Sequence, residues 1–236
     1  MEKSSDKRIV YAIGIIGIIS IFFVVSTFAS PFLLKISSET KLDSFLFFMN
    51  RSFMWLALLL LWLYAKRVEK KSLLLWSKRK RKILFSILAI FAILLVIFLG
   101  IFLGNMLISK ILSYFPTSTN ITSPKLLEYG TLFRHNIPLL IFTAATAAIV
   151  EELVFRGYIQ PRIEVIFKNP IWGIIGSALL FALLHLSYDS WLQIIGPLFI
   201  GLVLSIFYWK YRNIKILIIC HFVIDLIGLF SLINVH

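Results

Sequence analysis

The stretch "AATAAIVEELVFRGYI", residues 144–159, decides the fold because it sets two glutamates and an arginine in an otherwise apolar run. Of the 236 residues of the chain, 60% are hydrophobic and only 15% are charged. This excess of apolar residues is typical of a membrane protein rather than of a soluble domain. The three charges are therefore expected to lie in a membrane-spanning helix, where each of them needs a partner or a function.

Apolar windows recur along the chain and predict an all-α polytopic membrane protein. A hydrocarbon core about 30 Å thick needs about 20 apolar residues per helix. Windows of this kind predict a bundle of about seven (seven to eight) transmembrane helices, at residues 9–29, 42–64, 83–108, 137–159, 171–186, 191–209 and 214–233. Between two of them, "QPRIEVIFKNP", residues 160–170, is predicted to be a short cytoplasmic amphipathic segment, with a break at Pro161 and a new helix opening at Pro170.

The positive charge of the chain is explained by membrane topology. The net charge is +13, and most of the 24 lysines and arginines fall on one side if the N-terminus is cytoplasmic. The positive-inside rule therefore predicts an integral membrane protein with a cytoplasmic N-terminus. The basic segment 65–82 could bind nucleic acid in a soluble protein, but between two spans it indicates a loop that rests on anionic lipid. We expect the lipid bilayer and no nucleic acid as a partner.

Two parts of the chain differ in their ionisable residues. Residues 1–136 hold N-terminal transmembrane helices, the basic cytoplasmic loop 65–82 and a polar outer loop at 109–136, and their predicted spans carry almost no charge at mid-membrane depth. Residues 137–236 carry charges in three spans and are predicted to be the functional helical core.

The single cysteine, Cys220, excludes an intrachain disulfide and a cysteine-based zinc cluster.

The three charges of the opening stretch are not equivalent. Glu152 and Arg156 are four residues apart with the acid first, the order that favours an ion pair on a helix. Glu151 points about 100° away from Glu152 around the helix, on a face that it shares with Ala147 and Ala148. Because small residues let a neighbouring helix approach closely, we expect Glu151 to find its partner on another helix.

Three further ionisable residues lie in later spans. His185 ends the run "IIGSALLFALLHLS", and His221 and Asp225 are four residues apart in "ICHFVIDLIG", on one helix face. Each of them alone could be a packing residue with a local hydrogen bond. Together with the glutamates they must all find partners in a dry medium, and they do so most simply by converging on one site.

Such a site could activate water. A carboxylate can serve as general base, and imidazoles can serve as hydrogen-bond donors or metal ligands. Two histidines and a carboxylate also form a catalytic zinc set with an open position for water; here the ligands would be His185, His221 and Glu151. A Zn²⁺-dependent route and a metal-free route both stay open. Hydrolysis is the favoured reaction class, and in a membrane the bond that needs such a site is a peptide bond.

Three motifs carry a resemblance to a known family. "EELVFR" (residues 151–156) matches E-E-x-x-x-R, "FALLH" (181–185) matches F-x-x-x-H, and "HFVID" (221–225) matches H-x-x-x-N or H-x-x-x-D. With these motifs in this order, the chain resembles the CPBP family of intramembrane proteases, also called the CAAX-protease or Abi family. The resemblance covers roughly residues 137–233.

The resemblance implies a role for each motif residue. Glu151 would activate water with the help of His185. His221 and Asp225 would stabilise the oxyanion or help to hold a metal, and Glu152 and Arg156 would support the site. Some relatives carry Asn where this chain has Asp225, whose added negative charge favours a metal or a protonated histidine nearby.

The resemblance also implies a substrate class and a location. The substrate would be a membrane-associated peptide or protein, cleaved near the cytoplasmic leaflet of a bacterial plasma membrane. In small bacterial members the family is associated with bacteriocin immunity and peptide maturation, besides CAAX-type processing.

Two other classes of function stay open. An Abi-like, non-enzymatic scaffold would use the same helices to bind a partner protein. A transporter could relay protons through paired carboxylates and break a helix at Gly196-Pro197. The complete set of three motifs favours the enzyme, and the absence of repeated hydrophobic halves in the sequence argues against the transporter.

Overall fold

A computed structural model describes residues 2–24, 44–114, 124–188 and 192–233 of the chain. These residues form α1 (Glu2–Val24), α3 (Ser44–Arg67), α4 (Ile83–Tyr114), α5 (Pro124–Arg134), α6 (Ile137–Glu151), a π-helix (Glu152–Ile159), α7 (Gln160–Phe167), α8 (Pro170–Leu183), a 3₁₀ turn (Leu184–Tyr188), α9 (Leu192–Tyr211) and α10 (Ile214–Ile233). The described part contains no strand, so the predicted all-α class is confirmed.

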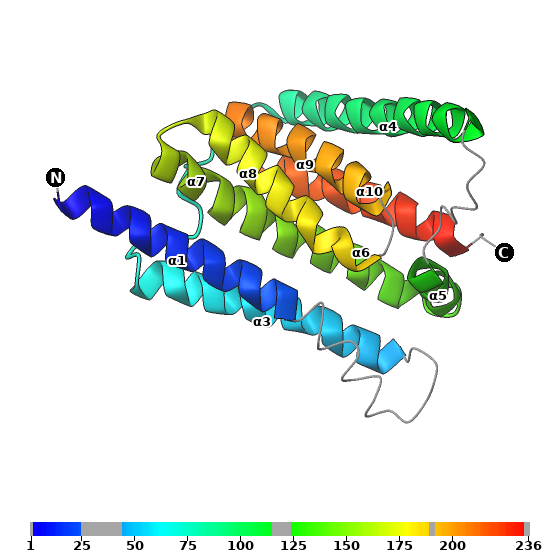
Figure 1. Cartoon of the computed structure of the whole chain (residues 1–236), viewed down its shortest axis with the longest axis horizontal. Coiled ribbons are helices and arrows are strands. Elements are labelled where there is room, and N and C mark those ends of the chain that lie inside the picture. Colours follow the sequence, from blue (N-terminus) through cyan, green and yellow to red (C-terminus); the bar gives the residue numbers. More distant parts are fainter. Residues whose placement is uncertain (1, 25–43, 115–123, 189–191, 234–236) are drawn as a thin grey trace.

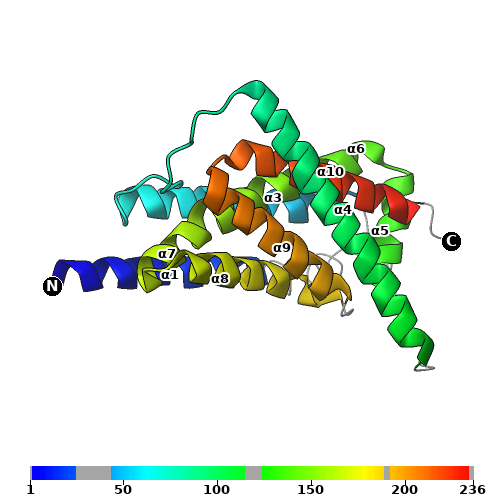
Figure 2. The same cartoon turned by 90° about the horizontal axis from the view of Figure 1, so that it is seen from above.

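The helices pack around a central rod made of α6, the π-helix and α7 (Figure 1). On one side of this rod α3 packs against α6, and α1 packs against α3 and α7. On the other side α10 packs against α6, and α8 pairs with both α7 and α9. Helix α4 packs against α9 and α10, and in Figure 2 it crosses α10 obliquely. The motif residues are therefore carried by the rod, α8 and α10, at the middle of the bundle.

Within the described residues, six helices are long and apolar enough to cross a membrane, which makes the chain an integral membrane protein. They lie within 7–24, 44–67, 83–110, 137–167, 194–211 and 214–233. The remaining predicted span, at 171–186, corresponds to the shorter apolar helix Pro170–Leu186. Parts of the predicted spans, at residues 25–29, 42–43 and 191, lie outside the described residues. The predicted outer loop 109–136 contains the end of α4 and all of α5, and its residues 115–123 also lie outside them.

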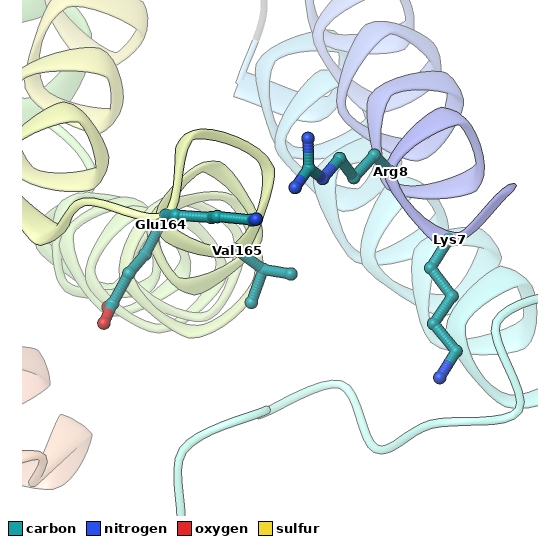
Figure 3. Close-up of a pocket in the computed structure, with 5 residues that line it drawn as sticks. Lys7, Arg8, Glu164 and Val165 are labelled. Atoms are coloured by element: carbon teal, nitrogen blue, oxygen red, sulfur yellow. The ribbon is translucent and has the colours of Figure 1, made fainter. Parts of the chain in front are cut away.

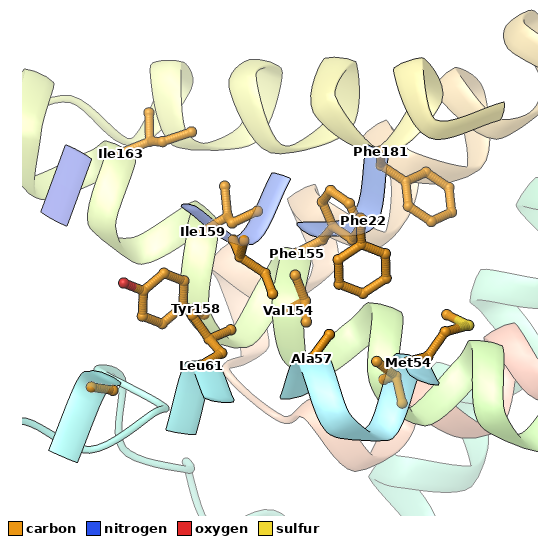
Figure 4. Packing of buried hydrophobic residues seen from close by; sticks show 13 residues of the cluster. Phe22, Met54, Ala57, Leu61, Val154, Phe155, Tyr158, Ile159, Ile163 and Phe181 are labelled. Carbon is orange, nitrogen blue, oxygen red and sulfur yellow. The ribbon is translucent and has the colours of Figure 1, made fainter. Parts of the chain in front are cut away.

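The largest apolar cluster surrounds the π-helix and joins it to α1, α3 and α8 (Figure 4). Phe155 is fully buried in it, and its ring meets the rings of Phe22 and Phe181 edge to face, with centroids 6.5 and 5.3 Å apart. Lipid tails are as apolar as these side chains, so the cluster is held by close packing rather than by exclusion of water. Ala144 and Ala148 of α6 are fully buried, in agreement with the close helix approach that the sequence predicts.

The predicted helix break at Pro161 is wrong. The helix continues to Phe167, and residues 160–163 are buried instead of forming a surface segment. Proline lacks an N–H, and its ring crowds the carbonyl four residues before it. The chain accommodates this with π-helical turns that end directly before α7, where the N–H of Gln160 bonds to the carbonyl of Phe155, five residues back. The wider turns keep the helix continuous through the proline.

The turn between α7 and α8 ends the rod sharply. Lys168 follows α7 in the left-handed conformation, with φ 56°. The side chain of Asn169 then accepts a hydrogen bond of 2.9 Å from the N–H of Ile171 and caps α8. Pro170 stands in the first turn of α8, where its missing N–H costs nothing. The prediction that Pro170 opens a helix is therefore confirmed.

A buried ion pair ties the part of the basic loop that follows α3, residues 68–82, to α7. Arg162 donates to both carboxylate oxygens of Glu69, and both side chains are fully buried. Arg162 also donates to the carbonyl of Leu73 at 3.0 Å, while the hydroxyl of Tyr158 donates to Glu69 at 2.5 Å. The loop is thus held by a desolvated network, although most of its lysines and arginines are exposed.

The basic segments meet at one end of the bundle. Lys7 and Arg8 of α1 line the same pocket as Lys168 after α7. Arg79 of the basic loop donates a hydrogen bond of 3.2 Å to the carbonyl of Lys210 at the end of α9. The segments that the positive-inside rule assigns to the cytoplasm therefore lie together, and the orientation itself stays a prediction.

Replacing Arg162 by methionine should release the basic loop. Removing one partner of a buried pair leaves Glu69 as an uncompensated charge, at a cost of about 3–5 kcal/mol, and the loop is the element that can move away. We expect trypsin to cut the loop of the detergent-solubilised variant at least about tenfold faster, because cleavage follows the population of the open form. Arg79→Met removes one exposed hydrogen bond and the trypsin site at position 79 itself, and it should leave the cleavage rate at the other lysines and arginines of the loop unchanged; equal acceleration in both variants would contradict the anchor.

Candidate functional site

Glu152 and Arg156 form the ion pair that the sequence predicts. Arg156 Nη1 lies 2.8 Å from Glu152 Oε1, and neither side chain is exposed. The guanidinium also donates to the carbonyl of Gly201 on α9 at 3.4 Å and stacks over the ring of Phe181, 4.5 Å from its centroid. Arg156 therefore joins the rod to α8 and α9 as well as neutralising Glu152.

His221 of α10 brings three carboxylates together. Its Nδ1 lies 2.8 Å from Glu152 Oε1, close enough for Nδ1–H to donate to the carboxylate. Its Nε2 lies 3.5 Å from Asp225 Oδ2 and 3.9 Å from Glu151 Oε2. The predicted approach of Glu151 to His221, and of His221 to Asp225 across one helix turn, is therefore found. Glu152 has a contact that the sequence did not predict, because it orients the imidazole as well as pairing with Arg156.

Exposure separates the buried side of this cluster from its open side. The side chains of Glu152 and Arg156 are 0% exposed and that of His221 is 5% exposed. On the Nε2 side, Glu151 is 12% exposed and Asp225 is 27% exposed. The open side of the site is therefore formed by Glu151 and Asp225, whereas Glu152 and Arg156 form its closed back.

His185 joins the cluster through an aromatic ring. It lies in the 3₁₀ turn that follows α8, and its Nδ1 lies 3.0 Å from the carbonyl of Phe181. The Phe181 ring is 5.0 Å from the His185 ring and 5.8 Å from the His221 ring, between centroids. His185 also interacts electrostatically with Asp225 and His221. Phe181, the first residue of its motif, is thus the packing partner of both histidines.

Arg51 of α3 is a charged neighbour of the site that the sequence analysis missed. It interacts electrostatically with Glu151, Asp225 and His185. Its guanidinium also lies 5.1 Å from the centroid of the Phe47 ring. The signal was present, since Arg51 is a cation in the predicted apolar span 42–64.

The predicted zinc ligands are not arranged as a metal site. Among the residues that the structure describes, no group of three or more His, Cys, Asp and Glu side chains could hold a metal ion. Zinc needs its nitrogen and oxygen ligands at about 2.0–2.2 Å. In both histidines Nδ1 contacts an oxygen, that of the Phe181 carbonyl or that of Glu152, so Nε2 is the nitrogen that a metal would use. The side chains as placed do not fit the predicted set of His185, His221 and Glu151, and Zn²⁺ dependence stays a prediction.

Comparison with known proteins supports the motif assignment. Residues 133–227 match the Rce1-like family, described as type II CAAX prenyl endopeptidase Rce1-like, and this part contains every motif residue. The predicted resemblance is thereby confirmed for this part of the chain. An uncharacterized protein of Bacillus subtilis (strain 168), YpbD, is 33% identical over 93 residues, which are 39% of this chain and 44% of that protein. The aligned part thus spans less than half of this curated relative. No solved structure matches the chain.

Proposed function

We propose that the chain is an intramembrane endopeptidase that hydrolyses a peptide bond of a membrane-associated peptide or protein, with Glu151 activating the attacking water. The observation that carries the proposal is the difference in exposure around His221. The closed pair of Glu152 and Arg156 fixes the imidazole from behind, and Glu151 and Asp225 stand on the accessible side. The match of residues 133–227 to a family of CAAX prenyl endopeptidases supports the same reaction class.

Glu151 would act first as a general base and then as a general acid. A water molecule beside its carboxylate attacks the carbonyl carbon of the scissile bond, and Glu151 takes one proton from that water. The new C–O bond turns the carbonyl oxygen into an oxyanion. As the C–N bond breaks, Glu151 returns the proton to the leaving nitrogen, so the carboxylate is regenerated and one water is consumed per bond.

His221 would stabilise the oxyanion. The hydrogen bond between Nδ1 and Glu152 fixes the ring, so that an imidazole carrying both protons directs its Nε2–H towards the open side of the site. A donor held in place before the reaction costs no reorganisation when the charge develops. Asp225, 3.5 Å from Nε2, favours the ring that carries this proton. His185 would assist Glu151 from the end of α8, and no step of this scheme passes through a metal.

The substrate must reach the site from within or beside the membrane. Glu151 lies in a helix long and apolar enough to span a bilayer, and the basic end of the bundle is predicted to be cytoplasmic. A peptide anchored in the cytoplasmic leaflet of a bacterial plasma membrane fits this arrangement, as in bacteriocin immunity, peptide maturation or CAAX-type processing. The direct test is incubation of the purified protein, in lipid nanodiscs, with a library of membrane-anchored peptides. New peptide termini found by mass spectrometry would support the proposal; an intact library would contradict it.

Arg51 should contribute to the reaction through its charge. It acts electrostatically on Glu151 and Asp225, and a cation in a water-poor site stabilises developing negative charge. We expect Arg51→Met to lower kcat/KM on a cleaved peptide about tenfold, a loss of about 1.4 kcal/mol of transition-state stabilisation. Arg51→Lys keeps the charge and should retain most of the activity. If the lysine variant were as slow as the methionine variant, packing on Phe47 rather than charge would explain the effect.

A further inference from the structure

A row of buried polar atoms follows the central rod at intervals of four residues. Glu152 Oε2, Arg156 Nε, Gln160 Oε1 and Glu164 Oε2 are all buried, and none has a hydrogen-bond partner among the described residues. The row begins at Glu152, which touches His221, and ends at Glu164 in α7. Twelve residues of α-helix span roughly 18 Å, and the wider π-helical turns at residues 152–159 rise less per residue, so the row covers at most about half the thickness of a bilayer.

The same side chains face α9 in a parallel register. Arg156 Nη2 donates to the carbonyl of Gly201 at 3.4 Å, and Gln160 Nε2 donates to the carbonyl of Ser205 at 2.9 Å. The donors, Arg156 and Gln160, are four residues apart, and so are the acceptors, Gly201 and Ser205. The two helices therefore run side by side in the same direction. The hydroxyl oxygen of Ser205 is buried and also lacks a partner within the described part of the chain. A polar seam therefore separates the rod from α9, although both helices are otherwise largely apolar.

The seam ends at the basic end of the bundle. Glu164 lines an open pocket of about 400 Å³ together with Lys7, Arg8, Val165 and Lys168 (Figure 3). In that view its carboxylate points away from Arg8, and its Oε2 atom is buried. Glu164 also interacts electrostatically with Arg212, which follows α9. The outer end of the seam thus lies where charged side chains meet water.

Burying a polar atom without a hydrogen bond costs about 1–3 kcal/mol, and the hydrocarbon around this bundle offers no partner. Buried water typically makes about three hydrogen bonds to such groups. We propose that the seam from Glu152 to Glu164, together with Ser205, binds a file of water molecules that connects the closed back of the site with the aqueous phase at the basic end of the bundle. This connection is separate from the open side at Glu151 and Asp225. It would let the Glu152–His221 pair exchange protons with water from behind, and its existence does not depend on the proposed peptidase activity.

A single cysteine placed in the seam tests the proposal. In a Cys220→Ala background, Ser205→Cys puts the only thiol in the seam, and Leu204→Cys puts it one position away in an apolar cluster at the same burial. Methyl methanethiosulfonate is small and neutral, so it reaches both thiols through lipid, but it reacts with the thiolate. A thiol ionises beside water and much less in apolar surroundings. Intact-protein mass spectrometry of the full chain in nanodiscs measures both rates, and modification in denaturant checks that both thiols can react.

We expect the thiol at position 205 to react at least about tenfold faster than the thiol at position 204, reflecting its larger thiolate fraction. Adding Gln160→Met, which keeps the side-chain length but removes both polar atoms, should slow labelling at position 205 to the rate at position 204. Equal rates in the two single-cysteine proteins would overturn the proposal, and so would fast labelling that survives Gln160→Met. Because no substrate is involved, an inactive protein with a reactive thiol at position 205 would contradict the peptidase and leave the water file standing.

Discussion

Replacing Glu151 by glutamine is expected to abolish peptide hydrolysis while leaving the protein folded. The amide cannot take a proton from water, and loss of a general base costs about 10²–10⁴ in rate. Glutamine has nearly the same size as glutamate, and Glu151 is the partly exposed glutamate of the pair, so the packing of α6 should persist. The measurement is kcat and KM on a membrane-anchored peptide that the unchanged protein cleaves, together with the melting temperature in detergent. We expect kcat to fall and KM to stay within about twofold, because the carboxylate acts mainly in the transition state.

Glu128→Gln provides the matched control. Glu128 lies on α5 with an exposed side chain, so the same chemical change should leave both rate and stability unaltered. Full hydrolysis by the Glu151 variant would overturn the assigned role of this residue. If, in addition, the variant preserved the phenotype of the protein in cells, the non-enzymatic scaffold would become the better explanation.

The fold was predictable as far as it depends on apolar length and on residue spacing. Six of the expected spans are found as long apolar helices, and the four-residue spacing correctly predicts both the Glu152–Arg156 pair and the contact of His221 with Asp225. The π-helix was not predictable in this way. Pro161 predicts a conflict in a helix, which can end the helix or distort it. Here the residues before and after Pro161 are buried, and the helix continues through wider turns instead of ending.

The candidate site was predictable in its members but not in its connections. A charge in an apolar span must find a partner, which is enough to select the motif residues. It does not indicate that Glu152 accepts hydrogen bonds from both Arg156 and His221, or that Phe181 packs against both histidines. These contacts depend on the rotation of α8 and α10 around the rod, which the spacing within one helix does not specify. Arg51 meets the same criterion, because it lies in the predicted span 42–64, but its links to Glu151 and Asp225 run between helices and could not be read from spacing.

Replacing Arg156 by methionine is expected to destabilise the protein strongly. The variant leaves the fully buried Glu152 without its cation, and breaking a buried pair in this way costs about 3–5 kcal/mol. It also removes the hydrogen bond to Gly201 and the stacking on Phe181 that join the rod to α8 and α9. Unfolding in mixed micelles, followed by helical circular dichroism, measures the loss. Arg67→Met changes an exposed arginine at the end of α3 and should shift the free energy of unfolding by less than about 0.5 kcal/mol.

A double variant separates the stability of this pair from its role in the site. Replacing both partners, as Glu152→Leu and Arg156→Met, removes the uncompensated charge, and apolar replacements of buried pairs are often neutral. Most of the lost stability should therefore return, less about 1–3 kcal/mol for the Nδ1–H of His221, which loses its acceptor. Hydrolysis should not return, because without Glu152 the imidazole is no longer held with Nε2 towards Glu151. A double variant that regained both stability and activity would show that Glu152 is a packing residue and that His221 is oriented by other contacts.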